Sequence, residues 1–198
     1  MLLPSLNARF LHIPKTGGCS IEESLAEYSD YNVLALYLRK VEGEEYLVNH
    51  QHALPEEVSR CKFTFSFVRN PWDRVVSYYF HVKRLGLLKQ DVSFQQMMDA
   101  WPNLQDIVPP RSMTDTFMLP CKRWAGSADF VGKFERINLD FARICLLLGI
   151  PMRNLLHVNK TEHSHYSKYY NELSMNMIGE FYKDDVLAYD YSFEVQGG

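Results

Sequence analysis

Short apolar runs that alternate with helical patterns are the feature that most constrains the fold of this chain. Apolar runs bounded by turn residues are typical of buried β-strands, and here they fall at 9–13, 33–38, 63–68, 129–134 and 155–158. Helical patterns fall at 20–28, 71–85, 94–100, 139–148 and 174–182. Because a helix is the usual crossover between parallel strands, this alternation predicts an α/β protein with a central parallel sheet flanked by helices.

The length and charge of the chain narrow the class further. Its 198 residues predict a single domain over 1–198, with 108–120 as an irregular insertion. The net charge of −3 excludes a global positive field that would hold nucleic acid. The N-terminus has no signal-peptide pattern, and no run approaches the roughly 20 apolar residues of a membrane span. We therefore expect a cytoplasmic protein that binds anions only at local sites.

The four cysteines do not suggest a disulfide scaffold or a metal site. Cys19, Cys61, Cys121 and Cys145 are far apart in the sequence, and their spacing matches no zinc motif. We expect reduced thiols and no bound metal.

The first candidate anion site is a strand, a glycine turn and a helix in close succession. The segment 10–20 reads FLHIPKTGGCS, and a helix is expected to open at Ser20 with Glu22 and Glu23 in its first turn. A loop of this kind presents backbone N–H groups at the positive end of a helix. An alternative interpretation is that Gly17 and Gly18 only permit a sharp turn.

Three side chains could add to the binding capacity of this loop. Lys15 supplies a positive charge, and Thr16 and Ser20 supply hydroxyl groups that can reach a phosphate or sulfate. The loop is not a nucleotide P-loop, because the lysine precedes the glycines and the upstream glycine of that motif is missing.

A second candidate site follows another strand. The strand 63–68 leads into Arg69, after which Asn70 is expected as N-cap and Pro71 as the first helical residue. Asp73, Ser77 and His81 recur every four residues, which predicts that Ser77 lies on the face of the helix away from the core. Arg69 and Ser77 can meet one phosphate only if the guanidinium reaches along the helix. Taken alone, Arg69 could equally be a surface ion-pair residue and Ser77 a helix filler.

These motifs together resemble the sulfotransferase superfamily, and within it the carbohydrate sulfotransferases of the heparan 2-O, chondroitin and bacterial types. The resemblance runs in patches from about residue 10 to 193, through HIPKTGGCS, FSFVRNPWDRVVSYY and VGKFERINLDFARICLLLGIP. It implies a P-loop NTPase-like three-layer fold, PAPS as donor and PAP as product. It also implies that the 5′-phosphosulfate is bound by Lys15, Thr16, Gly17, Gly18, Cys19 and Ser20, and the 3′-phosphate by Arg69 and Ser77. One departure is Cys19, where the family commonly has Thr or Ser, because a thiol donates hydrogen bonds poorly.

A base is needed to take the proton from an attacking acceptor hydroxyl, and histidine titrates nearest neutral pH. The His-x-His pair of His50 and His52 resembles the place where the heparan 2-O enzymes carry their catalytic histidine, so His52 is the expected base and His50 an assisting or acceptor-contacting residue. The alternative is that both are exposed loop histidines. His163 and His165 repeat the spacing, and we interpret them as structural or substrate-side residues.

The expected function is therefore transfer of a sulfuryl group from PAPS to an acceptor hydroxyl, with a saccharide as the favoured acceptor and Lys15 assisting departure of PAP. Two alternatives stay open: a non-catalytic PAPS- or PAP-binding module, and a phosphotransferase of P-loop type. The sequence has no recognisable aspartate to hold magnesium for the latter. It also gives no indication of the oligomeric state.

Overall fold

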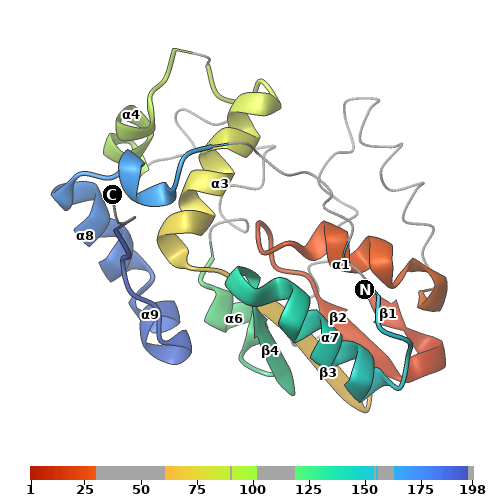
Figure 1. Cartoon of the computed structure of the whole chain (residues 1–198). Helices are drawn as coiled ribbons and strands as arrows, with labels where there is room; N and C mark the ends of the chain where they lie inside the picture. The colour runs from red at the N-terminus through yellow and green to blue at the C-terminus, as the bar shows by residue number, and fades with distance from the viewer. Residues whose placement is uncertain (30–60, 90, 102–118, 154, 156–162, 196–198) are drawn as a thin grey trace. The chain divides into compact units, whose positions relative to one another are not determined.

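The computed structural model describes residues 1–29, 61–89, 91–101, 119–153, 155 and 163–195. The chain divides into two compact units (Figure 1). Unit 1 comprises residues 1–68 and 123–159, and unit 2 comprises residues 69–122 and 160–198. The strand expected at 33–38, nearly all of 155–158 and most of the insertion at 108–120 lie outside the described residues. The expectation of a single domain stays a prediction.

Unit 1 contains a four-stranded sheet in the order β1-β2-β3-β4. The strands are β1 (Leu2–Leu3), β2 (Ala8–Leu11), β3 (Phe63–Val68) and β4 (Phe130–Lys133). β2 pairs parallel with β3, and β3 pairs parallel with β4, whereas β1 pairs antiparallel with β2. The predicted α/β class with a sheet flanked by helices is confirmed, but the sheet is mixed because a two-residue edge strand precedes β2.

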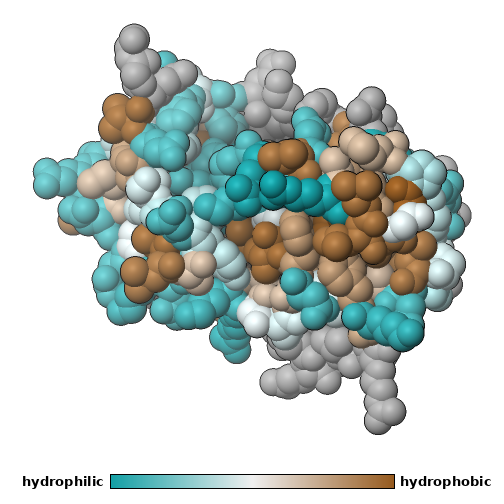
Figure 2. All heavy atoms as spheres, turned by 60° about the horizontal axis from the view of Figure 1, so that its bottom comes forward, coloured by the Kyte–Doolittle hydropathy of each residue, from teal (hydrophilic) through white to brown (hydrophobic). Residues whose placement is uncertain are grey.

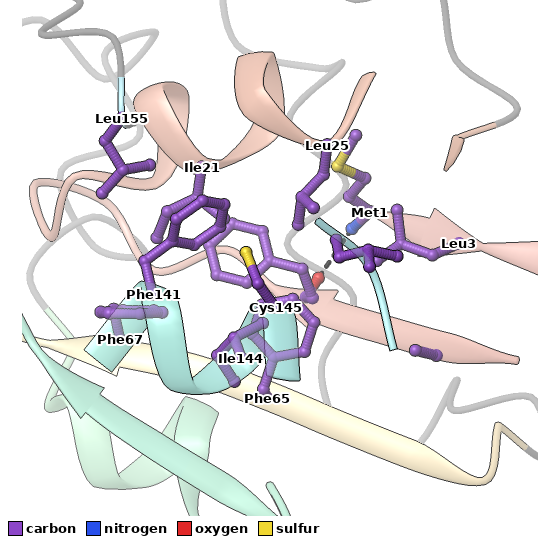
Figure 3. Packing of buried hydrophobic residues seen from close by; sticks show 13 residues of the cluster. Met1, Leu3, Ile21, Leu25, Phe65, Phe67, Phe141, Ile144, Cys145 and Leu155 are labelled. Carbon is purple, nitrogen blue, oxygen red and sulfur yellow. Dashed lines mark hydrogen bonds between the residues drawn. The ribbon is translucent and has the colours of Figure 1, made fainter. Parts of the chain in front are cut away.

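One face of this sheet carries the core of unit 1. Phe65 and Phe67 on β3 point to the same face because side chains alternate along a strand, and Phe10 is the register partner of Phe65. Two helices, α1 (Gly18–Ser24) and α7 (Ile137–Leu148), cover this face. Figure 3 shows their apolar side chains directed at the strand phenylalanines. The buried residues contributed by these helices and the residue after α1 are Ile21, Leu25, Phe141, Ile144 and Cys145.

Polar contacts of two aspartates stabilise β4 and α7 in unit 1. The Asp129 carboxylate, just before β4, accepts hydrogen bonds from the Thr64 backbone N–H at 2.7 Å and from its hydroxyl at 2.8 Å. Buried Asp140 on α7 accepts from Arg136 and Arg143. The outer surface of unit 1 includes exposed Leu139, Leu146 and Leu147 of α7, and Figure 2 shows hydrophobic side chains gathered on one face of the molecule.

The helix α3 (Pro71–Arg84) is the longest helix that the structure describes, and it belongs to unit 2. Asn70 caps it by accepting from the Trp72 N–H at 3.1 Å, and Pro71 is its first residue, as predicted. The other elements of this part of the chain are α4 (Phe94–Asp99), the start of α6 (Cys121–Ala125), η7 (Tyr166–Tyr169), α8 (Glu172–Phe181) and α9 (Lys183–Tyr189).

Unit 2 contains buried charges that connect distant segments. Asp185 on α9 is fully buried and accepts from the backbone N–H groups of Cys121 and Lys122 at 2.6 and 2.7 Å. Arg74 of α3 is 1% exposed, donates to the Leu119 carbonyl at 2.8 Å and lies over the Tyr182 ring. Each of these two buried charges therefore has partners, as burial requires.

Short 3₁₀ turns complete the described residues. They are η1 (Pro4–Leu6), η2 (Ala26–Tyr28) and η6 (Phe134–Arg136). The helix expected over 20–28 is thus an α-helix that ends at Ser24, followed by η2. Its predicted start was also wrong by two residues, because α1 begins at Gly18, which puts Glu22 beyond the first turn.

Candidate functional site: two loops that follow parallel strands

The first loop, called the β2–α1 loop (residues 12–17), has an unusual backbone. Lys15 has φ 68° and Gly17 has φ 84°, so two residues of this short turn lie in the left-handed region. The left-handed conformation is unfavourable for a residue with a side chain, so Lys15 is held there by its surroundings. The Thr16 side chain is fully buried, and its hydroxyl donates to the Ile13 carbonyl at 2.8 Å. This hydrogen bond closes the turn from inside.

Both glycines of this loop are required by space, and Gly17 is also required by its left-handed conformation. A Cβ on Gly17 would lie 2.6 Å from Ile137 Cδ1, and a Cβ on Gly18 would lie 2.4 Å from the His12 ring. Real Cβ atoms do not approach other atoms this closely, so a side chain at either position would force the loop or its neighbours to move. The glycines therefore allow the backbone to lie in close contact with the side chains of Ile137 and His12. The interpretation that they serve only to permit a sharp turn is too narrow.

The remaining residues of the first site lie at the start of α1. Gly17 is the N-cap residue, and its carbonyl accepts the first helical hydrogen bonds from Ser20 and Ile21. Cys19 is half-buried and Ser20 is buried. The structure places Lys15, Thr16 and Ser20 around one turn in unit 1, but the Thr16 hydroxyl, expected to reach a bound anion, donates to Ile13 within the turn instead. Anion binding by these residues stays a prediction.

His12 is a residue that the sequence analysis passed over. It directly follows β2, is 6% exposed, and its Nδ1 lies 3.0 Å from Glu22 Oε1 of α1. A single histidine in an apolar strand is typical of a core residue, so pattern alone gave no reason to select it. One sequence feature could have identified His12. It lies two residues after Phe10, on the same face of the strand, and close to the glycine turn.

The second site begins at the boundary of unit 2. Arg69 follows β3 directly and is 7% exposed, and its Nε donates to Asp73 Oδ2 at 2.8 Å within the first turn of α3. Ser77 is buried at 4% exposure, so the prediction that it faces away from the core is wrong. The reason is that α3 is not a surface helix: most of its fourteen residues are buried, on more than one side. Arg69 belongs to a buried ion pair rather than to a surface one.

The candidate base falls outside this description, since His50 and His52 are not among the described residues. The other pair is engaged locally in unit 2. His163 Nδ1 lies 2.8 Å from the Ser164 carbonyl, and the ring stacks on Phe80. His165 caps η7 by accepting from the Ser167 N–H. These contacts agree with the structural interpretation of this pair.

The C-terminal tyrosines are packing residues with hydrogen-bonded hydroxyls. The Tyr170 hydroxyl donates to the Trp72 carbonyl at 2.9 Å, and the Tyr166 hydroxyl accepts from the Glu194 N–H at 2.8 Å. Burial raises the pKa of each of these two tyrosines above the ordinary value for a tyrosine. Both therefore stay neutral at physiological pH, and neither is suited to act as a base.

Two properties of the described residues bear on the class of protein. No described helix is long and apolar enough to cross a membrane. Within the same residues, no group of three or more His, Cys, Asp or Glu side chains is arranged to hold a metal ion.

Comparison with known proteins identifies the family. The model of the sulfotransferase family (Sulfotransfer_2) matches residues 4–192, which is nearly the whole chain and includes both loops. The chain belongs to the sulfotransferase family. This agrees with the resemblance carried by the HIPKTGGCS and FVRNPWDRVVSYY motifs.

Two individual proteins are similar to parts of the chain. A protein of Archaeoglobus fulgidus described as uncharacterized is 29% identical over 105 residues, which is 52% of this chain and 82% of that protein. A sulfotransferase crystal structure from Alicyclobacillus acidocaldarius aligns with a TM-score of 0.40 and 16% identity, over 66% of this chain. The present chain covers 56% of the length of that structure.

Proposed function

We propose that this protein transfers a sulfuryl group from PAPS to a hydroxyl group of an acceptor, with a saccharide as the favoured acceptor and PAP as the product. The observation that carries the proposal is the β2–α1 loop, in a chain that belongs to the sulfotransferase family. Its two glycines cannot be replaced without collision, and a lysine is held between a strand and a helix start. Backbone amides near a helix start, together with a lysine, suit a bound phosphosulfate.

The residues of the first loop have different parts in this proposal. Lys15 supplies the positive charge, and its left-handed backbone is part of the tight turn between β2 and α1. Thr16 contributes its N–H and the shape of the turn, because its hydroxyl donates to Ile13. Gly17, Gly18 and Ser20 contribute the close backbone at the start of α1. Cys19 contributes its backbone only, since a thiol is a weak donor.

Arg69 and Ser77 are proposed to hold the 3′-phosphate of the same donor. The Asp73 carboxylate supports this role for Arg69, because the 2.8 Å bond to Nε fixes the direction of the guanidinium plane. Ser77 lies two turns further along the same helix, and its burial keeps its hydroxyl in a fixed environment.

PAPS supplies an activated sulfuryl group, and the protein residues supply position and charge. In the proposed step, His52 takes the proton of the acceptor hydroxyl while the hydroxyl oxygen forms a bond to sulfur. The bond between sulfur and the departing phosphate oxygen breaks, and Lys15 neutralises the charge that develops on that oxygen. His50 assists or contacts the acceptor.

Calorimetric titration with PAP and with PAPS tests the donor. We expect both to bind the parent chain, and we expect Arg69→Ala to abolish binding or weaken it at least tenfold. Arg84→Ala is the matched control, because Arg84 is an exposed residue of the same helix. ATP with magnesium is the competitor control. Preference for ATP and magnesium would favour a phosphotransferase, and absence of PAP binding would exclude the proposed reaction.

A second experiment separates an enzyme from a binding module. We expect His52→Ala to lose turnover with a panel of saccharide acceptors while its dissociation constant for PAP stays that of the parent. A parent chain that binds PAPS but sulfates no hydroxyl acceptor would instead indicate a non-catalytic binding module.

A further inference from the structure

An imidazole at the start of the β2–α1 loop ends a row of aromatic rings. Phe63 stacks on Phe65 at 5.9 Å between ring centroids, Phe65 on Phe10 at 5.2 Å, and Phe10 on His12 at 5.8 Å. The first three rings are apolar and belong to the core of unit 1. The fourth is polar and is nevertheless buried, at 6% exposure. A phenyl ring could continue the row there, so packing alone does not explain a histidine.

Glu22 provides the polar partner that this ring faces. Its Oε1 lies 3.0 Å from His12 Nδ1, and its side chain is only 15% exposed. This is the distance of a close polar contact between an imidazole nitrogen and a carboxylate oxygen. The pair joins the end of β2 to α1 across the β2–α1 loop. Removal of two polar groups from water is unfavourable, so a contact of this kind adds little to the stability of the fold. It is better explained by the position that it imposes on the imidazole ring.

The opposite edge of the ring faces the loop backbone. A Cβ on Gly18 would lie 2.4 Å from both Nε2 and Cδ2 of His12, so the ring edge is packed directly against the first residue of α1. Rotation of the imidazole would therefore move Gly18. The loop also holds Lys15 and Gly17 in the left-handed region, a conformation that for a lysine persists only where neighbouring atoms enforce it.

We propose that His12, oriented by Glu22, is a positioning residue for donor binding. The imidazole supports the backbone at Gly18, and through it the turn that carries Lys15, so that the turn already has its binding conformation when the donor arrives. This inference rests on the proposed function, because it assigns His12 a role toward the same phosphosulfate loop. It makes the Glu22 to His12 contact a determinant of donor affinity.

Calorimetric titration with PAP tests the pair through matched variants. Glu22→Ala removes the carboxylate that faces His12, and Glu23→Ala is its control on the exposed side of the same helix. We expect Glu22→Ala to raise the dissociation constant of PAP about tenfold, a typical coupling between groups that act together, and Glu23→Ala to leave it within about twofold. The thermal unfolding temperature of each variant is measured to separate a change in affinity from a loss of folded protein.

Two substitutions of His12 separate positioning from packing. His12→Phe fills the space but has no polar atom to face Glu22, and we expect PAP affinity to fall about tenfold in a folded protein. His12→Asn retains a polar group near the position of Nδ1 in a smaller side chain, and we expect it to bind PAP at least about three times more tightly than His12→Phe, although Asn leaves a cavity.

The outcomes are distinct from those of the proposed function. If the parent chain does not bind PAP, the proposed function fails. If the parent binds PAP but Glu22→Ala binds it as tightly as Glu23→Ala, or His12→Phe binds it as tightly as the parent, the positioning role is overturned. The same holds if His12→Asn is no better than His12→Phe. If His12→Phe does not fold, the Glu22 and Glu23 pair decides the question.

Discussion

At the scale of single residues, Gly17 and Gly149 share a left-handed backbone but differ in their surroundings. Gly149, the C-cap of α7, has φ 68°, and a Cβ added there would meet nothing within 4 Å, whereas Gly17 has φ 84° and its Cβ would meet Ile137 at 2.6 Å. We expect Gly149→Ala to cost about 1 kcal/mol, the strain alone. Gly17→Ala should cost at least about 1 kcal/mol more, because overpacking is added.

Urea unfolding of the two variants measures this difference in the free energy of unfolding. Equal losses would mean that the β2–α1 loop can shift to admit a methyl group, which would contradict the close contact described for the candidate site.

The four thiols should differ in reactivity because their environments differ. Burial raises the pKa of Cys121 to about 12, and burial also raises the pKa of Cys145. Since only the thiolate reacts, both should stay unmodified at about pH 8 in the folded protein. Cys19 and Cys61 are half-buried and should be alkylated first.

Mass spectrometry after brief treatment with iodoacetamide, with and without urea, identifies the modified positions. Alkylation of Cys121 in the absence of urea, at the rate of Cys61, would show that its surroundings in unit 2 open readily.

At the scale of elements, Asp129 ties the start of β4 to β3. Hydrogen bonds from the Thr64 N–H and hydroxyl lower the pKa of Asp129. A lowered pKa in the folded state stabilises the protein at pH values above the ordinary pKa of about 3.9, and this contribution is lost as the pH falls through the folded value. We expect Asp129→Asn to be less stable than the parent at about pH 7, and the difference to shrink toward about pH 3.

Denaturant unfolding at several pH values provides the measurement, and exposed Asp99 of α4 offers a control as Asp99→Asn. A difference for Asp129→Asn that stays constant across this pH range would show that the charge of this carboxylate does not contribute.

The elements also show what the sequence could and could not predict. The bounds of β3 and the cap of α3 were predicted correctly, because an alternating run followed by Asn70 and Pro71 is determined by local rules. The strand β1 was missed, since two residues are too few to show a period. Ser77 was placed on the wrong face because helical periodicity assumes one buried side. His12 was passed over because its partner Glu22 becomes visible only when α1 is folded against β2.

At the scale of the whole molecule, Asp185 connects parts of unit 2 that are far apart in the sequence. Its carboxylate accepts from the N–H groups of Cys121 and Lys122 at the start of α6. Asp185→Ala leaves two amides without this acceptor, at about 1–3 kcal/mol each where buried, so we expect a loss of about 3 kcal/mol. Asp184→Ala, at the exposed neighbouring position, should change stability by less than about 0.5 kcal/mol.

Chemical denaturation of both variants, followed by far-ultraviolet circular dichroism, measures the two losses. A similar small loss in both would mean that residues 121–122 are held against α9 without the buried carboxylate.

The interleaving of the two units along the chain has a consequence for synthesis in the cell. The phenylalanine face of β2 and β3 is complete once residue 68 has been made, but α7, which covers it with Phe141 and Ile144, is encoded after the first segment of unit 2. At roughly 5–20 residues per second, the ribosome needs several seconds to reach α7. During that interval the nascent chain has only α1 of the two helices that cover this face, so the part of the face that α7 covers is available to nascent-chain chaperones.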